Sequence, residues 1–292
     1  MKEQIHYKNF NIEQNYKAVY YFLKDCGYSE NYISNLRKKE NSILVNNKPS
    51  NTRTPLQIGD MLQIDSSPNK KTTIMPCILP LDIVYEDAYY LLVNKPSGLS
   101  CMPNKSHYSL NLAGAILNYM QEKDQNFVVR IINRLDKDTA GLILVAKNSL
   151  ALQEIKEVQK SYLAVVKGII DKPITINAPI KTICENGINN IKRVIADDGK
   201  EAITHIFPIK QTKEGNTLVE LNLQHGRTHQ IRLHCSSIGH PLIGDKIYGQ
   251  EDTLISHTAL VCYKMSFYHP YLKKVLEFTI DLPTDIKNLI TE

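Results

Sequence analysis

An aspartate and a later arginine-bearing segment are the residues of this chain best suited to chemistry. Asp136 follows Arg134 after a single leucine, and a short polar turn with glycine then leads into an apolar, strand-like run. This arrangement places a carboxylate at a turn beside a rigid sheet, where it can reach a substrate. The segment at residues 225–234 contributes Arg227 and Arg232. Together these residues predict an anionic substrate that is bound by arginines and reacts with one carboxylate.

The segments that must position these residues alternate between strand-like and helix-like patterns from Leu81 onward. Two apolar runs around an acidic turn predict a hairpin, and a later stretch has the spacing of an amphipathic helix. Most connections are too short for parallel crossovers, which need about a dozen residues or more. The predicted fold class is therefore α+β with a largely antiparallel mixed sheet. The hairpin, the helix and four later strands are predicted at residues 83–93, 110–120, 143–146, 162–166, 202–207 and 218–223.

The first part of the chain has a self-contained pattern of two helices followed by a small basic sheet. An apolar helical stripe begins at Val19 and stops at Gly27, and a second helix carries cations at its end. Short strands are predicted at residues 43–45 and 61–64. A polar, proline-bearing stretch then indicates a linker. The predicted division is an N-terminal domain at 1–66, a linker at 67–80 and a catalytic domain at 81–292.

The bulk composition is that of a folded protein with a mild preference for anionic partners. The 292 residues suffice for about two domains, and 42% are hydrophobic, 22% are charged and the net charge is +5. The start of the chain has no signal-peptide pattern, and no apolar run approaches the roughly 20 residues that span a bilayer. Six cysteines without a C-x-x-C pair predict reduced thiols. We expect a cytoplasmic protein without membrane contact.

The N-terminal pattern resembles the S-four domain, an RNA-binding motif of a small-subunit ribosomal protein and several RNA-modifying enzymes. The matching segments are YSENYISNLRKK, ILVNNKP and IGDMLQI. The resemblance implies a small α/β RNA-binding domain in which the basic residues Arg37, Lys38, Lys39 and Lys48 contact RNA. The alternative is a small α/β appendage with a solvated cationic face.

The rest of the chain resembles the RluA family of pseudouridine synthases. The most diagnostic matches are NRLDKDTAGLILVAKN and GRTHQIRLHCSSIGHPLIGDKIYG, with NKPSGL, KSYLAVVKG and HPYLKKVLEFTIDLP in the expected order over residues 80 to 286. The resemblance implies the pseudouridine synthase fold and the isomerisation of a uridine within RNA. It also implies that no cofactor and no metal are needed. The sequence agrees, since it has no Walker motif, no G-x-G-x-x-G and no zinc spacing.

The resemblance implies three catalytic residues. Asp136 matches the essential aspartate, which either attacks the ribose C1′ or assists removal of a ribose proton. Arg232 matches the arginine that pairs with this aspartate and keeps it ionised, and Thr228 is predicted to cap its helix. Tyr162 matches an active-site tyrosine that stacks on the uracil. The alternatives are a turn aspartate, a phosphate-binding arginine and a core tyrosine.

Four further residues are predicted to bind the substrate. Arg134 resembles the arginine that is inserted where the target nucleotide leaves the RNA stack; a structural salt bridge is its alternative. Leu233 resembles the apolar floor of the base pocket, with core packing as its alternative. Arg227 and His229 belong to the same motif as Arg232.

Two positions depart from the family pattern, and a group of histidines invites a metal interpretation. Asn133 stands where many members have histidine, and Ala140 where serine is frequent; neither belongs to the groups expected to react. The spacing of His229, His234 and His240 matches no structural zinc pattern, so no metal site is predicted.

The sequence therefore predicts a monomeric RNA pseudouridine synthase that acts on specific uridines in structured RNA. Ribosomal RNA is favoured over transfer RNA because the N-terminal domain is basic. One alternative is a non-catalytic RNA-binding assembly factor on the same fold, against which the retained Asp136, Tyr162 and Arg232 argue. Another is a hydrolase that cleaves N-glycosidic bonds with the same carboxylate, which no feature of the sequence favours.

Overall fold

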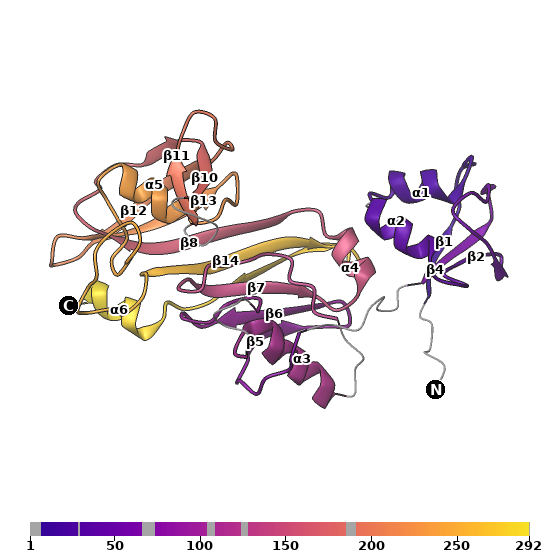
Figure 1. Cartoon of the computed structure of the whole chain (residues 1–292), viewed down its shortest axis with the longest axis horizontal. Helices are drawn as coiled ribbons and strands as arrows, with labels where there is room; N and C mark the ends of the chain where they lie inside the picture. Colours follow the sequence, from indigo (N-terminus) through magenta and orange to yellow (C-terminus); the bar gives the residue numbers. More distant parts are fainter. Residues whose placement is uncertain are drawn as a thin grey trace.

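The computed structural model describes residues 7–28, 30–65, 74–103, 109–123, 128–184 and 191–291. Within these ranges the strands form a four-stranded sheet, a nine-stranded sheet and a two-stranded ribbon. Figure 1 shows the four-stranded sheet and two helices at one end of the molecule, and the nine-stranded sheet extending away from them. The predicted linker overlaps residues 66–73, which lie outside the described ranges.

The N-terminal domain packs two helices against an antiparallel sheet. Val19 and Leu23 of the first helix, and Ile33 and Leu36 of the second, form its core with Leu62. The helices and strands follow the predicted order, but the first strand is not predicted because its sequence, YKNFN, is mostly polar. The elements are β1 (Tyr7–Asn11), α1 (Val19–Asp25), α2 (Glu30–Arg37), β2 (Ile43–Val45), β3 (Lys48–Pro49) and β4 (Met61–Asp65), in the sheet order β1-β4-β2-β3.

The rest of the chain, predicted above to be the catalytic domain, is built on the larger sheet, in the order β5-β6-β7-β14-β8-β13-β12-β9, with β15 beside β14. This mixed, largely antiparallel sheet with few helices confirms the predicted fold class. The strands are β5 (Asp82–Glu86), β6 (Tyr90–Lys95), β7 (Ala140–Ala146), β8 (Val158–Val166), β9 (Ile174–Asn177), β12 (Ile203–Gln211), β13 (Thr217–Leu223), β14 (Leu260–His269) and β15 (Lys274–Thr279). The ribbon pairs β10 (Ile180–Cys184) with β11 (Ile191–Ile195), and the helices are α3 (Leu112–Glu122), α4 (Ser149–Glu154), α5 (Gln230–Ser237) and α6 (Thr284–Thr291).

Strands β6 and β7 are buried on both faces of the sheet. Every residue of β7 is buried, as are all those of β6 except Asn94. Such near-continuous burial explains why these strands appear in the sequence as unbroken apolar runs rather than alternating ones. Figure 1 shows α3 beside β5 and β6, on the side of the sheet away from the β10–β11 ribbon. The core thus fixes β7, whose first residues follow the loop that carries Asp136.

A parallel contact joins the start of β7 to the start of β14. Gly141 pairs with Cys262 and has a φ of +115°, a conformation that side chains rarely adopt. A Cβ at Gly141 would lie 2.6 Å from the backbone nitrogen of Cys262. Cys262 in turn pairs with Tyr162 of β8. This close approach leaves only β14 between the start of β7, which follows the aspartate loop, and β8, which carries Tyr162.

The two domains touch through α4. Leu150 of this helix is buried in the core of the N-terminal domain. Tyr28 donates a hydrogen bond of 3.1 Å to Glu154, and Lys8 forms an ion pair with the same carboxylate. Because β8 begins four residues after Glu154, the helix that contacts the N-terminal domain leads directly into the strand that carries Tyr162.

Candidate active site

Asp136 lies in the loop that enters β7, and a buried lysine holds this loop. Lys95, at the end of β6, is fully buried. Its ammonium donates hydrogen bonds of 2.9 to 3.0 Å to the carbonyl oxygens of Pro96, Leu99 and Lys137. Burial lowers the pKa of Lys95 to about 8. The lysine therefore ties the residue next to Asp136 to the end of β6.

Two neighbouring side chains bind carbonyl oxygens of the same loop. The Ser97 hydroxyl donates to the carbonyl oxygen of Asp138 at 2.9 Å, and the Cys101 thiol donates to that of Leu135 at 3.2 Å. Together with the bond from Lys95, these contacts fix the main chain on both sides of Asp136. The segment containing NKPSGL, which the sequence matched without a role, thus acts as a cradle for the loop, formed by Lys95, Ser97 and Cys101.

Asn133, one of the departures from the family pattern, secures the other end of the loop. Its side chain is buried and donates to the carbonyl oxygen of Leu142 at 3.0 Å. Its amide oxygen accepts from the backbone nitrogen of Leu144 at 2.8 Å. The amide therefore forms two hydrogen bonds with β7, much as a neighbouring strand would.

The Asp136 carboxylate faces two nitrogen-bearing side chains without touching either. Its Oδ2 lies 3.9 Å from Nη1 of Arg232 and 3.9 Å from Nε2 of His229. Both distances exceed those of a hydrogen bond. Among the described residues the carboxylate accepts no hydrogen bond, and 26% of its side chain is exposed. Its hydrogen-bonding capacity is thus available to a substrate.

Arg232 lies within ion-pair distance of Asp136, the residue with which it was predicted to pair, but its hydrogen bonds go to another carboxylate. Arg232 donates through Nε and Nη2 to Asp245, at 2.8 and 2.6 Å. Both side chains are buried, and Asp245 also accepts from the backbone nitrogens of Ile247 and Tyr248. Although burial alone opposes the charge, the hydrogen bonds and attraction of Asp245 raise the pKa of Arg232. The sequence analysis gave Asp245 no role, although GDKIYG lies within its second motif.

His229 is the N-cap residue of α5 and has a left-handed conformation, with φ of 58°. Its ring nitrogen Nδ1 lies 3.1 Å from the hydroxyl of Tyr248. Burial lowers the pKa of His229, although the nearby Asp136 opposes this effect. The predicted capping by Thr228 is wrong, because His229 occupies the N-cap position and forms no side-chain cap hydrogen bond. Instead the Gln230 side chain accepts from the backbone nitrogen of Arg227 at 3.0 Å.

Tyr162 is almost fully buried and lines the same cleft as Asp136. Burial raises the pKa of Tyr162 well above its ordinary value, and the neighbouring Cys262 and Asp136 add to the shift. Its hydroxyl therefore remains protonated at neutral pH. The tyrosine can donate a hydrogen bond or contact a base through its ring.

These residues line a cleft of about 470 Å³. Its polar wall includes Asp136, Arg134, Arg227, His229 and Arg232. Apolar residues from three strands also line it. Two lysines, one in β8 and one in the segment just before it, line the cleft as well; neither was predicted from the sequence. The apolar residues are Val158, Leu223 and Leu260, and the lysines are Lys156 and Lys160.

The predicted substrate-binding residues differ in their placement. Arg134 is exposed and forms no ion pair within the described ranges, so the salt-bridge alternative is wrong there. Arg227 is half-buried and donates through Nε to the carbonyl oxygen of Glu201 at 3.0 Å. Leu233 is half-buried but does not line the cleft, so its predicted position as the floor of the base pocket is wrong. Leu260 lines the cleft instead.

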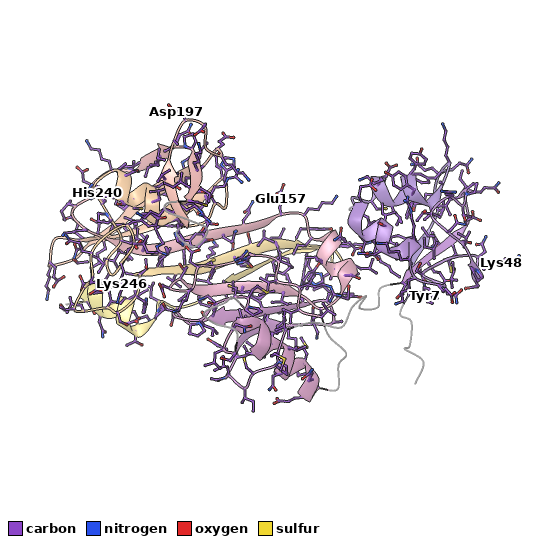
Figure 2. The ribbon with its side chains drawn as sticks, in the orientation of Figure 1. Tyr7, Lys48, Glu157, Asp197, His240 and Lys246 are labelled. Atoms are coloured by element: carbon purple, nitrogen blue, oxygen red, sulfur yellow. The ribbon has the colours of Figure 1, made fainter. Side chains whose placement is uncertain are left out.

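The predicted RNA-binding cations of the N-terminal domain lie on its surface. Arg37, Lys38 and Lys48 are exposed, whereas Lys39 is half-buried and forms an ion pair with Asp65. Figure 2 shows Lys48 at the end of this domain away from the catalytic domain. The charge of Lys39 is thus partly neutralised within the protein.

The histidines that invited a metal interpretation are engaged elsewhere. His234 bonds Thr204 and the carbonyl oxygen of Ala178, both at 2.9 Å. His240 bonds the carbonyl oxygen of Lys167 at 2.8 Å. In the part of the chain that the structure describes, no group of three or more His, Cys, Asp or Glu side chains is arranged to hold a metal ion. No helix in that part is long and apolar enough to cross a membrane.

The catalytic domain is similar to solved structures of human proteins. It matches human RNA pseudouridylate synthase domain containing 4 with a TM-score of 0.55 and 21% identity, over 70% of this chain and 90% of that chain. Human RNA pseudouridylate synthase domain containing 1 gives 0.53 and 23%, over 73% and 86%. These likenesses show a shared fold.

The sequence comparisons extend beyond the fold. The chain is 32% identical to "Uncharacterized RNA pseudouridine synthase YjbO" of Bacillus subtilis, over 91% of this chain and 95% of that protein. It is 34% identical to "Ribosomal large subunit pseudouridine synthase D" of Neisseria meningitidis, over 87% and 72%. The family described as RNA pseudouridylate synthase matches residues 89–237, which include Asp136, Tyr162 and Arg232. The chain therefore belongs to the RNA pseudouridylate synthase family, a family of isomerases.

Proposed function

We propose that this chain isomerises specific uridines in structured RNA, with ribosomal RNA favoured, by a cofactor-free mechanism that depends on Asp136. The observation that carries the proposal is the position of Asp136. Its loop is fixed by main-chain hydrogen bonds, yet its carboxylate is free of hydrogen bonds within the described residues and opens into a cleft. A fixed main chain with an available carboxylate suits a group that must react with a bound ribose.

The proposed reaction balances without an oxidant or reductant. The bond between N1 of uracil and C1′ of ribose breaks, the ring turns, and a bond forms between C5 and C1′. The proton on C5 leaves and N1 gains a proton. Asp136 either attacks C1′ and is released when C5 attacks in turn, or removes a ribose proton and later returns it. In both routes the cation of Arg232 lies 3.9 Å from the Asp136 carboxylate and attracts it.

Tyr162 and the arginines have distinct proposed roles. The raised pKa of Tyr162 keeps its hydroxyl protonated, so it serves as a hydrogen-bond donor and a ring that contacts the uracil. Arg134, exposed at the cleft, takes the place of the target base in the RNA stack, where extrusion costs a few kcal/mol. Arg227 and His229 contact the ribose and phosphate of the bound nucleotide.

Ribosomal RNA is the proposed substrate class for two reasons. A relative that is 34% identical is named for the large ribosomal subunit. The exposed cations Arg37, Lys38 and Lys48 lie on a domain separate from the cleft, which suits a large RNA with a second contact region. We expect the chain to act as a monomer.

The test is a map of pseudouridines in total RNA from a strain that lacks the gene. We expect one or a few ribosomal positions to lose pseudouridine, to regain it with the wild-type gene, and to stay unmodified with Asp136→Asn. Full restoration by Asp136→Asn would contradict the proposed mechanism. Tight RNA binding by the wild-type protein without any isomer would instead indicate an assembly factor.

A further inference from the structure

A second hollow, of about 640 Å³, adjoins the cleft. The two share four lining residues, Val158, Lys160, Leu223 and Gly226. Figure 2 shows Glu157, which lines the second hollow, on the side of β8 that faces the space between the β10–β11 ribbon and the N-terminal domain. The hollow is therefore open to a long ligand that also occupies the cleft.

The boundary between the two hollows is a free edge of β8. β13 pairs with β8 only from Ser161 onward, where Asn222 is its partner. On the other side, β14 continues to pair with β8 as far as Val158. Within the described ranges, residues 158–160 thus have a strand neighbour on one side only. A chain that crosses this edge passes from one hollow to the other beside exposed backbone groups.

The second hollow is rich in neutral hydrogen-bonding side chains. Gln159 is exposed and forms no side-chain hydrogen bond with the described residues. His225 has a buried ring nitrogen, Nδ1, without a hydrogen-bond partner there, and its Nε2 lies 3.6 Å from Glu201. Of the two lysines that line this hollow, Lys264 is paired with Glu277 at 3.0 Å. Amide and imidazole groups match the donors and acceptors on the edge of an unpaired base better than they match a phosphate.

Lys160 places a positive charge at the boundary between the two hollows. It is half-buried, lines both, and forms no ion pair with the described residues. Its neighbour in β14, Met265, is fully buried, so the sheet supports the base of the lysine. A cation at this point suits a phosphate that links two nucleotides, one on each side.

We propose that the second hollow binds the base of a nucleotide directly adjacent to the isomerised uridine, through Gln159 and His225, while Lys160 holds the phosphate between them. The inference rests on the proposed function, since it names a specificity subsite for that reaction. The catalytic domain itself would then contribute to the selection of the target uridine.

The experiment uses the full-length protein and a synthetic RNA that carries a uridine mapped in the total-RNA test. The base on the 5′ or the 3′ side of that uridine is replaced by an abasic ribose. For the wild type we expect one of these removals to raise KM about tenfold with little change in kcat. For Gln159→Ala and His225→Ala the same removal should change KM by less than about twofold, because the contact is already gone.

The phosphate is tested in the same way. A neutral methylphosphonate at the linkage on that side should raise KM for the wild type but not for Lys160→Ala. Gln211→Ala is the control, because Gln211 is exposed at the far end of β12 and should behave as the wild type. If neither abasic RNA raises KM, or if the variants respond like the wild type, the subsite is refuted while the isomerase activity stands. If the wild type modifies no uridine in the total RNA, the proposed function itself fails.

Discussion

Arg232 is bound by Asp245 at 2.6 and 2.8 Å, whereas its closest approach to Asp136 is 3.9 Å. Asp245 is held in turn by the backbone nitrogens of Ile247 and Tyr248. The orientation of the Arg232 guanidinium is therefore set by Asp245, which does not itself react. Asp136 can approach or release a ribose without any loss of the support for Arg232.

Replacement of Asp245 by asparagine should reduce both stability and activity. The amide keeps the shape but removes the charge that compensates buried Arg232, and breaking a buried pair costs about 3 kcal/mol or more. Urea denaturation measures the first effect and pseudouridine formation the second. Asp281→Asn is the control, because the Asp281 side chain is 95% exposed. A free energy of unfolding equal to that of the wild type would refute this role of the pair.

Replacement of Asp136 by asparagine should abolish activity but leave the stability of the fold almost unchanged. The carboxylate accepts no hydrogen bond within the described residues, so the free energy of unfolding should stay within about 0.5 kcal/mol of the wild-type value. Product formation should be lost, and RNA binding retained. The comparison of Asp136→Asn with Asp245→Asn by denaturation and filter binding separates the reacting group from the residue that positions its neighbour.

Gly141→Ala should destabilise the fold by about 3 kcal/mol. The added Cβ would meet the backbone of Cys262, and the φ of +115° is strained for alanine. Thermal unfolding measures the effect. Gly226→Ala is the matched control, because no atom lies within 4 Å of its added Cβ and its φ is not positive. Equal melting temperatures for the two variants would contradict the close contact of β7 and β14.

The stability should fall in mild acid through His229. Burial lowers its pKa below the ordinary value of 6.5, so the unfolded chain binds a proton more readily than the folded one. The contribution of His229 is therefore fully present above pH 6.5 and is lost as the pH falls from there toward the folded pKa. Denaturation at a series of pH values should show a shallower loss for His229→Gln than for the wild type.

The salt dependence of RNA binding should distinguish two adjacent lysines. Lys38 is exposed, whereas Lys39 is paired with Asp65. Lys38→Ala should reduce the slope of log affinity against log salt concentration by about 0.7 to 0.9, as for one lost phosphate contact. Lys39→Ala should reduce it less. Fluorescence titrations at several salt concentrations measure both, and equal slopes for the variants and the wild type would argue against RNA contact at this helix end.

Much of the catalytic domain could be predicted because its signals are local. The hairpin at β5 and β6 and the strands β7, β8, β12 and β13 are apolar runs bounded by turns. Each overlaps the range predicted for it, although β7, β8 and β12 extend three or four residues beyond that range. The loop with Asp136 could be located because a matching motif surrounds it. These features depend on neighbours in the sequence.

Most of what could not be predicted concerns contacts between distant segments. The partner of Arg232 depends on Asp245, and the cradle around Asp136 depends on Lys95; neither pairing leaves a periodic signal. Leu233 was assigned to the base pocket from its position in the motif, but the turn of α5 directs the cleft wall to Ile231 and Arg232 instead. A lysine that ends an apolar strand was a usable sign, since burying an ammonium requires several acceptors.

The cradle of Lys95, Ser97 and Cys101 binds the loop through carbonyl oxygens, which every amino acid possesses. The side chains of Lys137 and Asp138 are therefore not needed to hold Asp136 in place. These two positions can change in evolution or in the laboratory while the reacting carboxylate stays where it is. The position of the reacting carboxylate thus depends on the backbone of the loop and not on the side chains of Lys137 and Asp138, so both can be replaced without rebuilding the chemistry.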